Sequence, residues 1–253
     1  MGGRTTRTLH SQELVRLNPT VLWASGAAVP AVMKVTSTVP VVFLANDPLA
    51  AGMVKSLAHP GGNMTGISVQ SLDVANKRFE LLREAVSNIR RLVIMADATS
   101  GQTMLEMNAV QALARKFGID PIPLEITRTE EIELAFERLK NEKADALYVV
   151  INELLNANRL LIVKSAEAAR LPSVYGTHDW VRSGGLLSYG PNFPVLFVRS
   201  AEITDSILRG AKPENIPVEQ PTRFEFAVNL KTSKAIGVAL PESFLARADE
   251  VIE

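Results

Sequence analysis

The sequence predicts an α/β fold, with parallel strands and helices on both faces of each sheet. Short runs of apolar residues alternate along the chain with longer segments whose apolar residues recur at helical spacing. The short runs are continuously apolar, which is typical of strands that are buried on both faces in a parallel sheet. The 253 residues are enough for one large domain or for two lobes of ordinary size.

Four apolar runs are predicted strands. The first covers residues 21–24, and the second covers residues 39–45, which are rich in valine. The third, residues 92–95, follows two arginines, and residues 146–151 form the longest run. The segments between these runs are long enough for helical crossovers, so successive strands are expected to be parallel.

Helices are predicted between the strands. Residues 105–117 place their apolar side chains on one stripe, and Gly118 supplies a C-terminal stop. A second stripe runs through residues 132–139, with Thr129 as its N-cap and acidic residues in its first turn. A third stripe covers residues 81–89. Further helices are expected over 154–169 and 195–208, and a charged helix end over 246–253.

Composition excludes several classes of protein. Lys and Arg number 27 and Asp and Glu also number 27, which argues against a nucleic-acid binder and against a polybasic membrane anchor. The chain has no cysteine, so disulfides, thiolate catalysis and cysteine-ligated metals are excluded. No uncharged stretch is long enough to cross a bilayer, and the N-terminus lacks the apolar core of a secretory signal.

Two glycine-rich segments interrupt the alternation of strands and helices, at residues 60–66 and 184–192. They predict a discontinuous first lobe of residues 1–67 and 190–253, with residues 68–189 inserted as a second lobe. Hinges are expected near 61–68 and 184–192, where Gly61-Gly62 and Gly184-Gly185 allow backbone torsions to change.

From about Val35 to the end, a series of short motifs resembles one family. Examples are Asp-Pro at 47–48, Pro-Gly-Gly-Asn at 60–63, Ser-Tyr-Gly-Pro-Asn at 188–192, Gly-Ala-Lys-Pro at 210–213 and Asn-Leu-Lys-Thr at 229–232. In their order and spacing they resemble the substrate-binding proteins of ABC transporters, in particular the class related to tryptophan- and tyrosine-binding members.

This resemblance implies a two-lobed, type I periplasmic-binding-protein fold and a periplasmic or extracytoplasmic location. It also implies a small ligand with a carboxylate and an apolar or aromatic, amino-acid-like part, which is delivered to an ABC permease. Family members normally begin with a leader and then a strand, a helix and a second strand before the segment that resembles residues 14–28. That opening unit is missing here, so the first lobe is expected to be incomplete at its N-terminus, and the chain carries no signal peptide.

In a two-lobe α/β binder the ligand lies between the lobes, beyond the carboxyl ends of the strands. In the first lobe, backbone N–H groups and a hydroxyl at Ser25, Gly26 and Ala27 suit a ligand carboxylate, although a plain N-cap and tight turn is the alternative. After the second strand, the side-chain amide of Asn46 can both donate and accept hydrogen bonds to a ligand. Asp47, which precedes a proline, is either a ligand contact or an ordinary helix N-cap. Ser68 completes the candidates in this lobe.

Polar residues that follow the strands of the second lobe are expected to form the other wall of the site. A carboxylate there would pair with a ligand ammonium, and hydroxyls and amides would orient the rest; mere solvation is the alternative for each of them. The candidates are Thr99, Ser100, Asn152, Thr177 and Asp179.

Three functions are compatible with this architecture: a solute-binding protein, a ligand-sensing regulatory domain of the same fold, and an enzyme. His178 beside Asp179 suggests general-base chemistry, and Ser183 or Ser188 suggests a nucleophile. However, the chain has no Gly-x-Ser-x-Gly elbow and no phosphate-binding glycine loop, and its three histidines show no metal spacing. The prediction is therefore a solute-binding protein that uses no catalytic residue, metal or cofactor.

Overall fold

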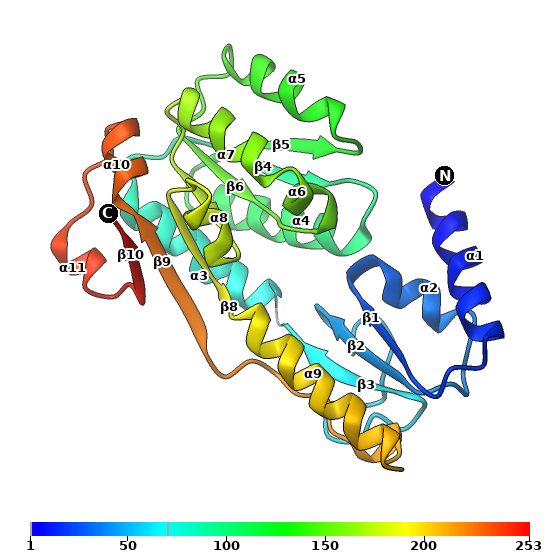
Figure 1. Cartoon of the computed structure of the whole chain (residues 1–253). Coiled ribbons are helices and arrows are strands. Elements are labelled where there is room, and N and C mark those ends of the chain that lie inside the picture. The colour runs from blue at the N-terminus through cyan, green and yellow to red at the C-terminus, as the bar shows by residue number, and fades with distance from the viewer. Residues whose placement is uncertain (1, 70) are drawn as a thin grey trace. The chain divides into compact units, whose positions relative to one another are not determined.

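The computed structural model describes residues 2–69 and 71–253, without the side chains of residues 2–7 and 71. The chain forms two compact units (Figure 1). Unit 1 comprises Met1–Ser71 and Phe193–Thr222, and unit 2 comprises Leu72–Asn192 and Arg223–Glu253. The chain therefore passes from one unit to the other three times.

Unit 1 contains a three-stranded parallel sheet in the order β1-β2-β3. The strands are β1 (Leu22–Ser25), β2 (Val41–Ala45) and β3 (Met64–Ser68). The central strand β2 is buried along its whole length, as its continuous run of apolar residues predicts.

Helices cover both faces of this sheet. The long helix α9 (Phe193–Leu208) places Leu196, Ile203 and Ile207 against β2 and β3. On the other face, the 3-10 turn Gly26–Ala28 leads into α2 (Val29–Met33), which packs on β1 and β2. Helix α1 (Gly2–Arg16) packs against α2, and a second 3-10 turn spans Pro213–Asn215.

Unit 2 contains a seven-stranded sheet in the order β10-β9-β8-β7-β6-β4-β5. All neighbouring strands are parallel except β8 and β9. The strands are β4 (Arg91–Asp97), β5 (Asp120–Ile126), β6 (Ala146–Val149), β7 (Ser173–Tyr175), β8 (Leu187–Pro191), β9 (Phe224–Asn229) and β10 (Glu250–Ile252).

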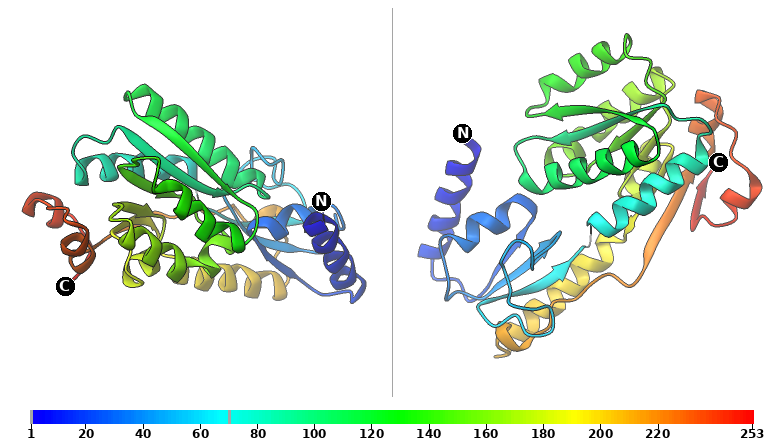
Figure 2. Two further views of the ribbon diagram at one scale, coloured as in Figure 1. Left: turned by 90° about the horizontal axis from the view of Figure 1, so that it is seen from above. Right: turned by 180° about the vertical axis from the view of Figure 1, so that it is seen from behind.

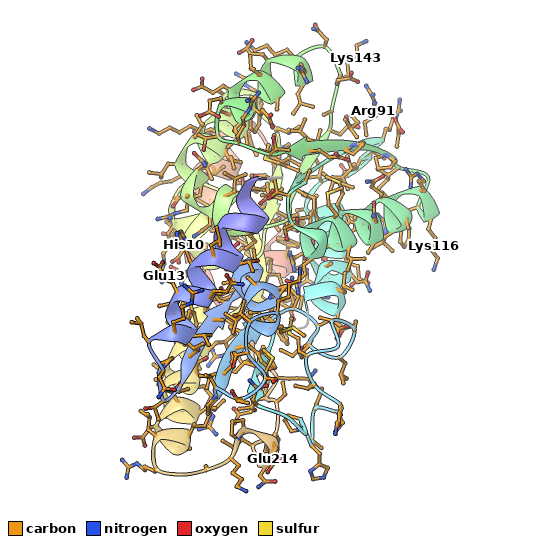
Figure 3. All side chains as sticks on the ribbon, turned by 90° about the vertical axis from the view of Figure 1, so that its right-hand side faces the viewer. His10, Glu13, Arg91, Lys116, Lys143 and Glu214 are labelled. Carbon is orange, nitrogen blue, oxygen red and sulfur yellow. The ribbon has the colours of Figure 1, made fainter. Side chains whose placement is uncertain are left out.

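Helices on both faces of this sheet bury two separate apolar cores (Figure 2). One face carries α3 (Ser71–Ala85), α4 (Gly101–Lys116), α10 (Leu230–Ile236) and α11 (Glu242–Leu245). The other face carries α5 (Glu130–Leu139), α6 (Glu153–Ala157), α7 (Arg159–Ala168) and α8 (His178–Arg182). Figure 3 shows the charged side chains of Lys116 and Lys143 extending away from the ribbon.

The predicted α/β class, with parallel strands and helices on both sheet faces, is confirmed. All four predicted strands are present with shifted ends. The helix expected over 154–169 is divided into α6 and α7 at Asn158, whose side-chain amide donates to the carbonyl oxygen of Leu154 at 2.8 Å. Strand β5 was not predicted, because Pro121 and Pro123 interrupt its pattern.

The division of the chain differs from the predicted lobes in its C-terminal part. Residues 223–253 were assigned to the first lobe but belong to unit 2, because β9 pairs with β8 and β10 pairs with β9. The segment 246–253, expected to be a helix end, contains β10.

The glycine pairs that were expected at hinges lie within the units rather than where the chain crosses between them. Gly61 and Gly62 lie in the loop between β2 and β3, and Gly184 and Gly185 lie between α8 and β8. A Cβ atom on Gly185 would lie 2.4 Å from the Tyr175 ring, so close packing requires glycine at this position.

No helix in the described part of the chain is long and apolar enough to cross a membrane.

Candidate functional site

The carboxyl ends of β4, β6 and β7 lie at one edge of the unit 2 sheet, because these neighbouring strands are parallel. After β4 the chain adds β5 on one side, and after β5 it returns to add β6 on the other side of β4. The point between β4 and β6 is therefore a topological switch point, where open α/β sheets bind their ligands.

Asp97 and Asn152 meet at this switch point. Asp97 ends β4 and is only 4% exposed; one carboxylate oxygen accepts from the Thr99 N–H at 2.7 Å, and the other accepts from the Asn152 amide at 2.5 Å. The Asn152 side-chain oxygen accepts from the Leu155 N–H at 3.1 Å and so caps α6. The pair holds a carboxylate and an amide in fixed positions where the two strands end.

Hydroxyl groups flank this pair. Ser100 and Thr177 occupy the N-cap positions of α4 and α8 in extended conformations, and neither side chain caps its own helix. The Thr103 hydroxyl lies 2.5 Å from the Asp97 carbonyl oxygen and 2.8 Å from that of Ser100, which fixes the turn before α4. A carboxylate, an amide and two hydroxyls thus lie at the ends of three neighbouring strands, a set that suits a small polar ligand.

A buried charged cluster connects helices α3 and α4 with strand β6. Glu106 Oε1 accepts from Arg78 Nη1 at 2.8 Å and from the Tyr148 hydroxyl at 2.9 Å. Arg78 and Glu106 are each 4% exposed, and burial raises the pKa of Tyr148 well above its usual value. A Cβ atom on Gly176, which follows β7, would lie 3.4 Å from Arg78 Nη1, so the cluster reaches the carboxyl edge of the sheet.

The Asp179 side chain is 60% exposed and lies beside His178. His178 lies 3.3 Å from Asp179 and, through Nδ1, 3.0 Å from a Glu225 carboxylate oxygen. The other Glu225 oxygen accepts from the Asn192 amide at 2.7 Å. These contacts tie α8 to the end of β8 and the start of β9, which is a structural role for His178.

In unit 1, the predicted residues likewise follow the ends of adjacent parallel strands. The Ser68 hydroxyl is buried and donates to the Asn46 carbonyl oxygen at 3.0 Å, so it supports the strand end. Asp47 Oδ1 accepts from the Ala50 N–H at 3.0 Å, which is the capping alternative. Ser25 precedes the 3-10 turn that holds Gly26 and Ala27, and its hydroxyl does not cap that turn.

The structure therefore brings Thr99, Ser100, Asn152 and Thr177 to one edge of unit 2, and Ser25, Asn46 and Ser68 to one edge of unit 1. Sequence reasoning did not select Asp97. Asp97 lies at the end of a predicted strand, two residues before Thr99. Its contact with Asn152 arises because β4 and β6 are neighbours, and only the sheet order reveals this.

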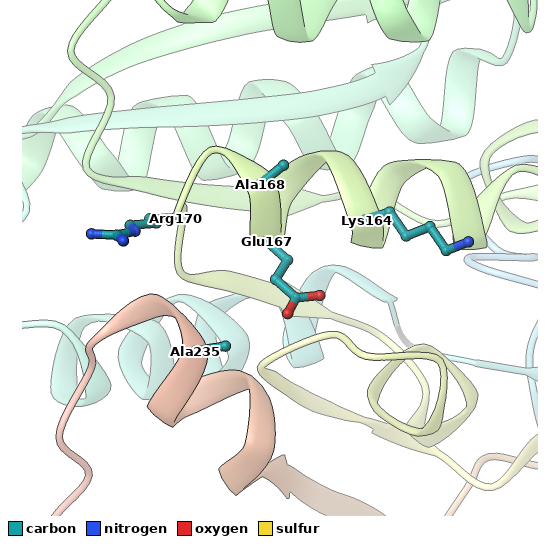
Figure 4. A pocket seen from close by; sticks show the side chains of 5 residues that line it. All are labelled: Lys164, Glu167, Ala168, Arg170 and Ala235. Atoms are coloured by element: carbon teal, nitrogen blue, oxygen red, sulfur yellow. The ribbon is translucent and has the colours of Figure 1, made fainter.

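An open hollow of about 410 Å³ lies between α7 and α10, lined by Lys164, Glu167, Ala168, Arg170 and Ala235 (Figure 4). It lies near the start of β7 and the end of the antiparallel β9, hence at the opposite edge of the sheet. Lys164 and Arg170 point away from each other, so its charges do not converge on a ligand. Among the described residues, no group of three or more His, Asp or Glu side chains is placed to hold a metal ion.

The model of the family "ABC transporter substrate binding protein" matches residues 6–252. A tyrosine-binding protein of Clostridioides difficile is 25% identical over 234 residues, which are 92% of this chain and 67% of that protein.

Two solved structures are also similar. An ABC domain from Streptococcus pneumonia in complex with L-Trp has a TM-score of 0.88 and 25% identity, over 99% of this chain and 87% of that one. A conserved domain protein from Vibrio cholerae has a TM-score of 0.89 and 24% identity, over 99% of this chain and 84% of that one. The fold is that of the type I periplasmic binding proteins.

Proposed function

Because this chain belongs to the ABC transporter substrate-binding protein family, we propose that it is the solute-binding component of an ABC importer. It binds a small, aromatic, amino-acid-like ligand with a carboxylate and delivers it to a permease. The family match over residues 6–252 supports the binding role. The ligand class is supported by a relative described as tyrosine-binding and by a similar structure in complex with L-Trp.

The observation that carries this proposal is the Asp97–Asn152 pair at the switch point of the unit 2 sheet. We propose that the Asp97 carboxylate accepts a hydrogen bond from the ligand ammonium and that the Asn152 amide orients the ligand. Thr99, Ser100, Thr177 and Asp179 supply further polar contacts from this unit. Charge-assisted hydrogen bonds of this kind are about twice as strong as neutral ones.

Unit 1 supplies the contacts to the ligand carboxylate in this proposal. The Ser25 hydroxyl does not cap the following turn, and Gly26 and Ala27 open that turn with backbone N–H groups. Asn46 adds an amide at the end of the neighbouring strand, while Asp47 and Ser68 hold the local backbone.

Proteins of this family are typically non-enzymatic and are extracytoplasmic or anchored as lipoproteins. We propose the same for this chain, which then releases its ligand unchanged outside the cytoplasm.

A ligand panel tests the function. Thermal unfolding of the purified chain is followed with L-Trp, L-Tyr and L-Phe, with tryptamine, which lacks the carboxylate, and with indole-3-propionate, which lacks the ammonium. A ligand at about 100 times its dissociation constant stabilises the folded state by about 2.7 kcal/mol. The amino acids are expected to raise the melting temperature, and the two truncated compounds are expected to do so far less. No shift with any compound in a folded sample contradicts the proposal.

A matched pair of variants tests the site. Asn152→Ala and Asn229→Ala each remove an asparagine N-cap, but Asn229 ends the antiparallel strand β9 and so lies at the opposite edge of the same sheet. Both variants are expected to lose about 1 kcal/mol or more of stability. Only Asn152→Ala is expected to weaken ligand binding measured by titration calorimetry, by roughly tenfold or more. Equal affinities in the two variants would exclude the unit 2 assignment while leaving ligand binding itself intact.

A further inference from the structure

Helix α8 carries two of the candidate ligand residues at the carboxyl edge of the unit 2 sheet. It spans only His178–Arg182 and follows β7, with Thr177 at its N-cap position and Asp179 in its first turn. A helix of this length is not stable by itself in water. The position of its first turn, and with it the position of both candidate side chains, is therefore set by contacts with the rest of the unit.

Each end of α8 contacts a carboxylate on a strand of the sheet, and the middle of the helix is held by the buried side chain of Trp180. At the first turn, His178 Nδ1 lies 3.0 Å from the Oε2 atom of Glu225 on β9. At the last residue of the helix, Arg182 Nε lies 2.9 Å from the Oε1 atom of Glu250 on β10. The His178 contact is the one that lies at the candidate ligand site.

The Glu225 carboxylate holds a second segment of the chain besides α8. Its Oε1 atom accepts from the Asn192 side-chain amide at 2.7 Å, while its Oε2 atom faces His178. Asn192 is the residue with which the chain leaves unit 2, and Glu225 lies next to the point where the chain returns at Arg223. One carboxylate therefore joins the start of α8 to the two segments by which the chain leaves and re-enters this unit.

The imidazole ring of His178 lies between two carboxylates. Its Nε2 atom is 3.3 Å from Asp179 Oδ1, and its Nδ1 atom is 3.0 Å from Glu225 Oε2. Carboxylates only accept hydrogen bonds, so the ring donates to both when both of its nitrogens carry a proton. The His178 side chain is only 12% exposed, which limits the orientations that the ring can adopt. The orientation of Asp179 thus depends on His178, and that of His178 depends on Glu225.

We propose that His178 and Glu225 are positioning residues of the ligand site, a proposal that rests on the binding function proposed above. Glu225 holds His178, and His178 in turn holds Asp179 and the first turn of α8. Ligand-binding groups are effective only when surrounding contacts keep them in the productive geometry. Because Glu225 also holds Asn192, a ligand that contacts α8 also fixes the segments by which the chain leaves and re-enters unit 2. Neither His178 nor Glu225 itself contacts the ligand.

Titration calorimetry of the full chain with L-Trp and with L-Tyr tests the proposal on a matched pair of variants. Glu225→Gln and Glu250→Gln each replace a carboxylate that contacts α8 by an amide of the same shape, at opposite ends of the helix. Glu225→Gln is expected to weaken binding by about threefold or more, as for residues that are coupled to a site, and Glu250→Gln by less than about twofold. Circular dichroism establishes that both variants are folded and compares their melting temperatures.

Variants of His178 test how the effect reaches the ligand. His178→Asn keeps an N–H donor near the position of Nδ1, so it is expected to keep most of the affinity that His178→Ala loses. In an Asp179→Ala background, His178→Ala is expected to cost much less affinity than in the unaltered chain, because the side chain through which it acts is then absent.

The outcomes separate this inference from the binding function. Unchanged affinity in Glu225→Gln, or an equal loss in Glu250→Gln, overturns the positioning role while the binding function stands. Full additivity of His178→Ala and Asp179→Ala also overturns it, because independent residues do not act through one another. If the unaltered chain binds neither amino acid, the binding function fails and this inference fails with it.

Discussion

Removing the charge of Glu106 is expected to destabilise unit 2 strongly. Glu106 is 4% exposed and accepts hydrogen bonds from both Arg78 and Tyr148, so its carboxylate compensates a buried guanidinium. Removing one partner of a buried ion pair leaves an uncompensated charge and costs about 3–5 kcal/mol. We expect Glu106→Gln to approach this loss, because the amide keeps an acceptor oxygen but carries no charge.

The assay is urea unfolding followed by the fluorescence of Trp180, which is fully buried in unit 2, in a Trp23→Phe background. A local probe is needed because a chain with two units need not unfold in one step. The expected loss lowers the melting temperature by roughly 6–20 °C, at 2–4 °C per kcal/mol for a unit of this size.

The double variant Arg78→Met/Glu106→Leu distinguishes an unpaired charge from lost packing. Replacing both partners of a buried ion pair by apolar residues is often neutral or stabilising, so the double variant should recover most of the stability. If it is as unstable as Glu106→Gln, or if Glu106→Gln costs less than about 1 kcal/mol, then charge compensation is not what this cluster provides.

Two further predictions concern close packing and pH. A Cβ atom on Gly66 would lie 2.0 Å from the Phe43 carbonyl oxygen. Gly66→Ala should therefore destabilise unit 1 by more than about 3 kcal/mol in urea unfolding. The control Gly62→Ala places its Cβ atom in open space and should cost less than about 1 kcal/mol. Burial raises the pKa of all three tyrosines, so the unfolded chain releases protons near pH 10 that the folded chain retains. The free energy of unfolding should therefore be unaffected below about pH 10 and fall above it. The ultraviolet absorbance of tyrosinate should rise only as the chain unfolds. A rise centred near pH 10 in the folded chain would contradict the raised pKa values of Tyr148, Tyr175 and Tyr189.

The part of the fold that could be predicted is the part that uses continuous apolar runs. Strands β2, β4 and β6 were found because parallel strands buried on both faces need apolar residues at every position. The placement of residues 223–253 could not be predicted, because the residue pattern of β9 and β10 does not indicate which of the two sheets these strands join. What assigns them to unit 2 is pairing with β8, a contact between residues far apart in sequence.

The candidate site was predictable to a similar depth. Polar residues after strands were expected at the carboxyl edge, and Asn152 and Thr177 are found there. Which strands are neighbours was not available from the sequence, so the direct contact of Asp97 with Asn152 was not foreseen. The buried cluster was missed for a related reason, since Arg78 and Glu106 lie on helices that read as ordinary charged surface until they are packed together.

The prolines that hid β5 from sequence analysis also decide what the outer side of that strand offers to other molecules. The Asp120 N–H donates to the Arg90 carbonyl oxygen, so residues 121 and 123 are the ones turned away from β4. Both are proline and have no N–H to give. Of the three outward positions of β5, a neighbouring strand would find a main-chain donor at Glu125 but none at residues 121 and 123. Addition of a further strand at this edge is therefore disfavoured by the backbone itself, independently of the surrounding side chains.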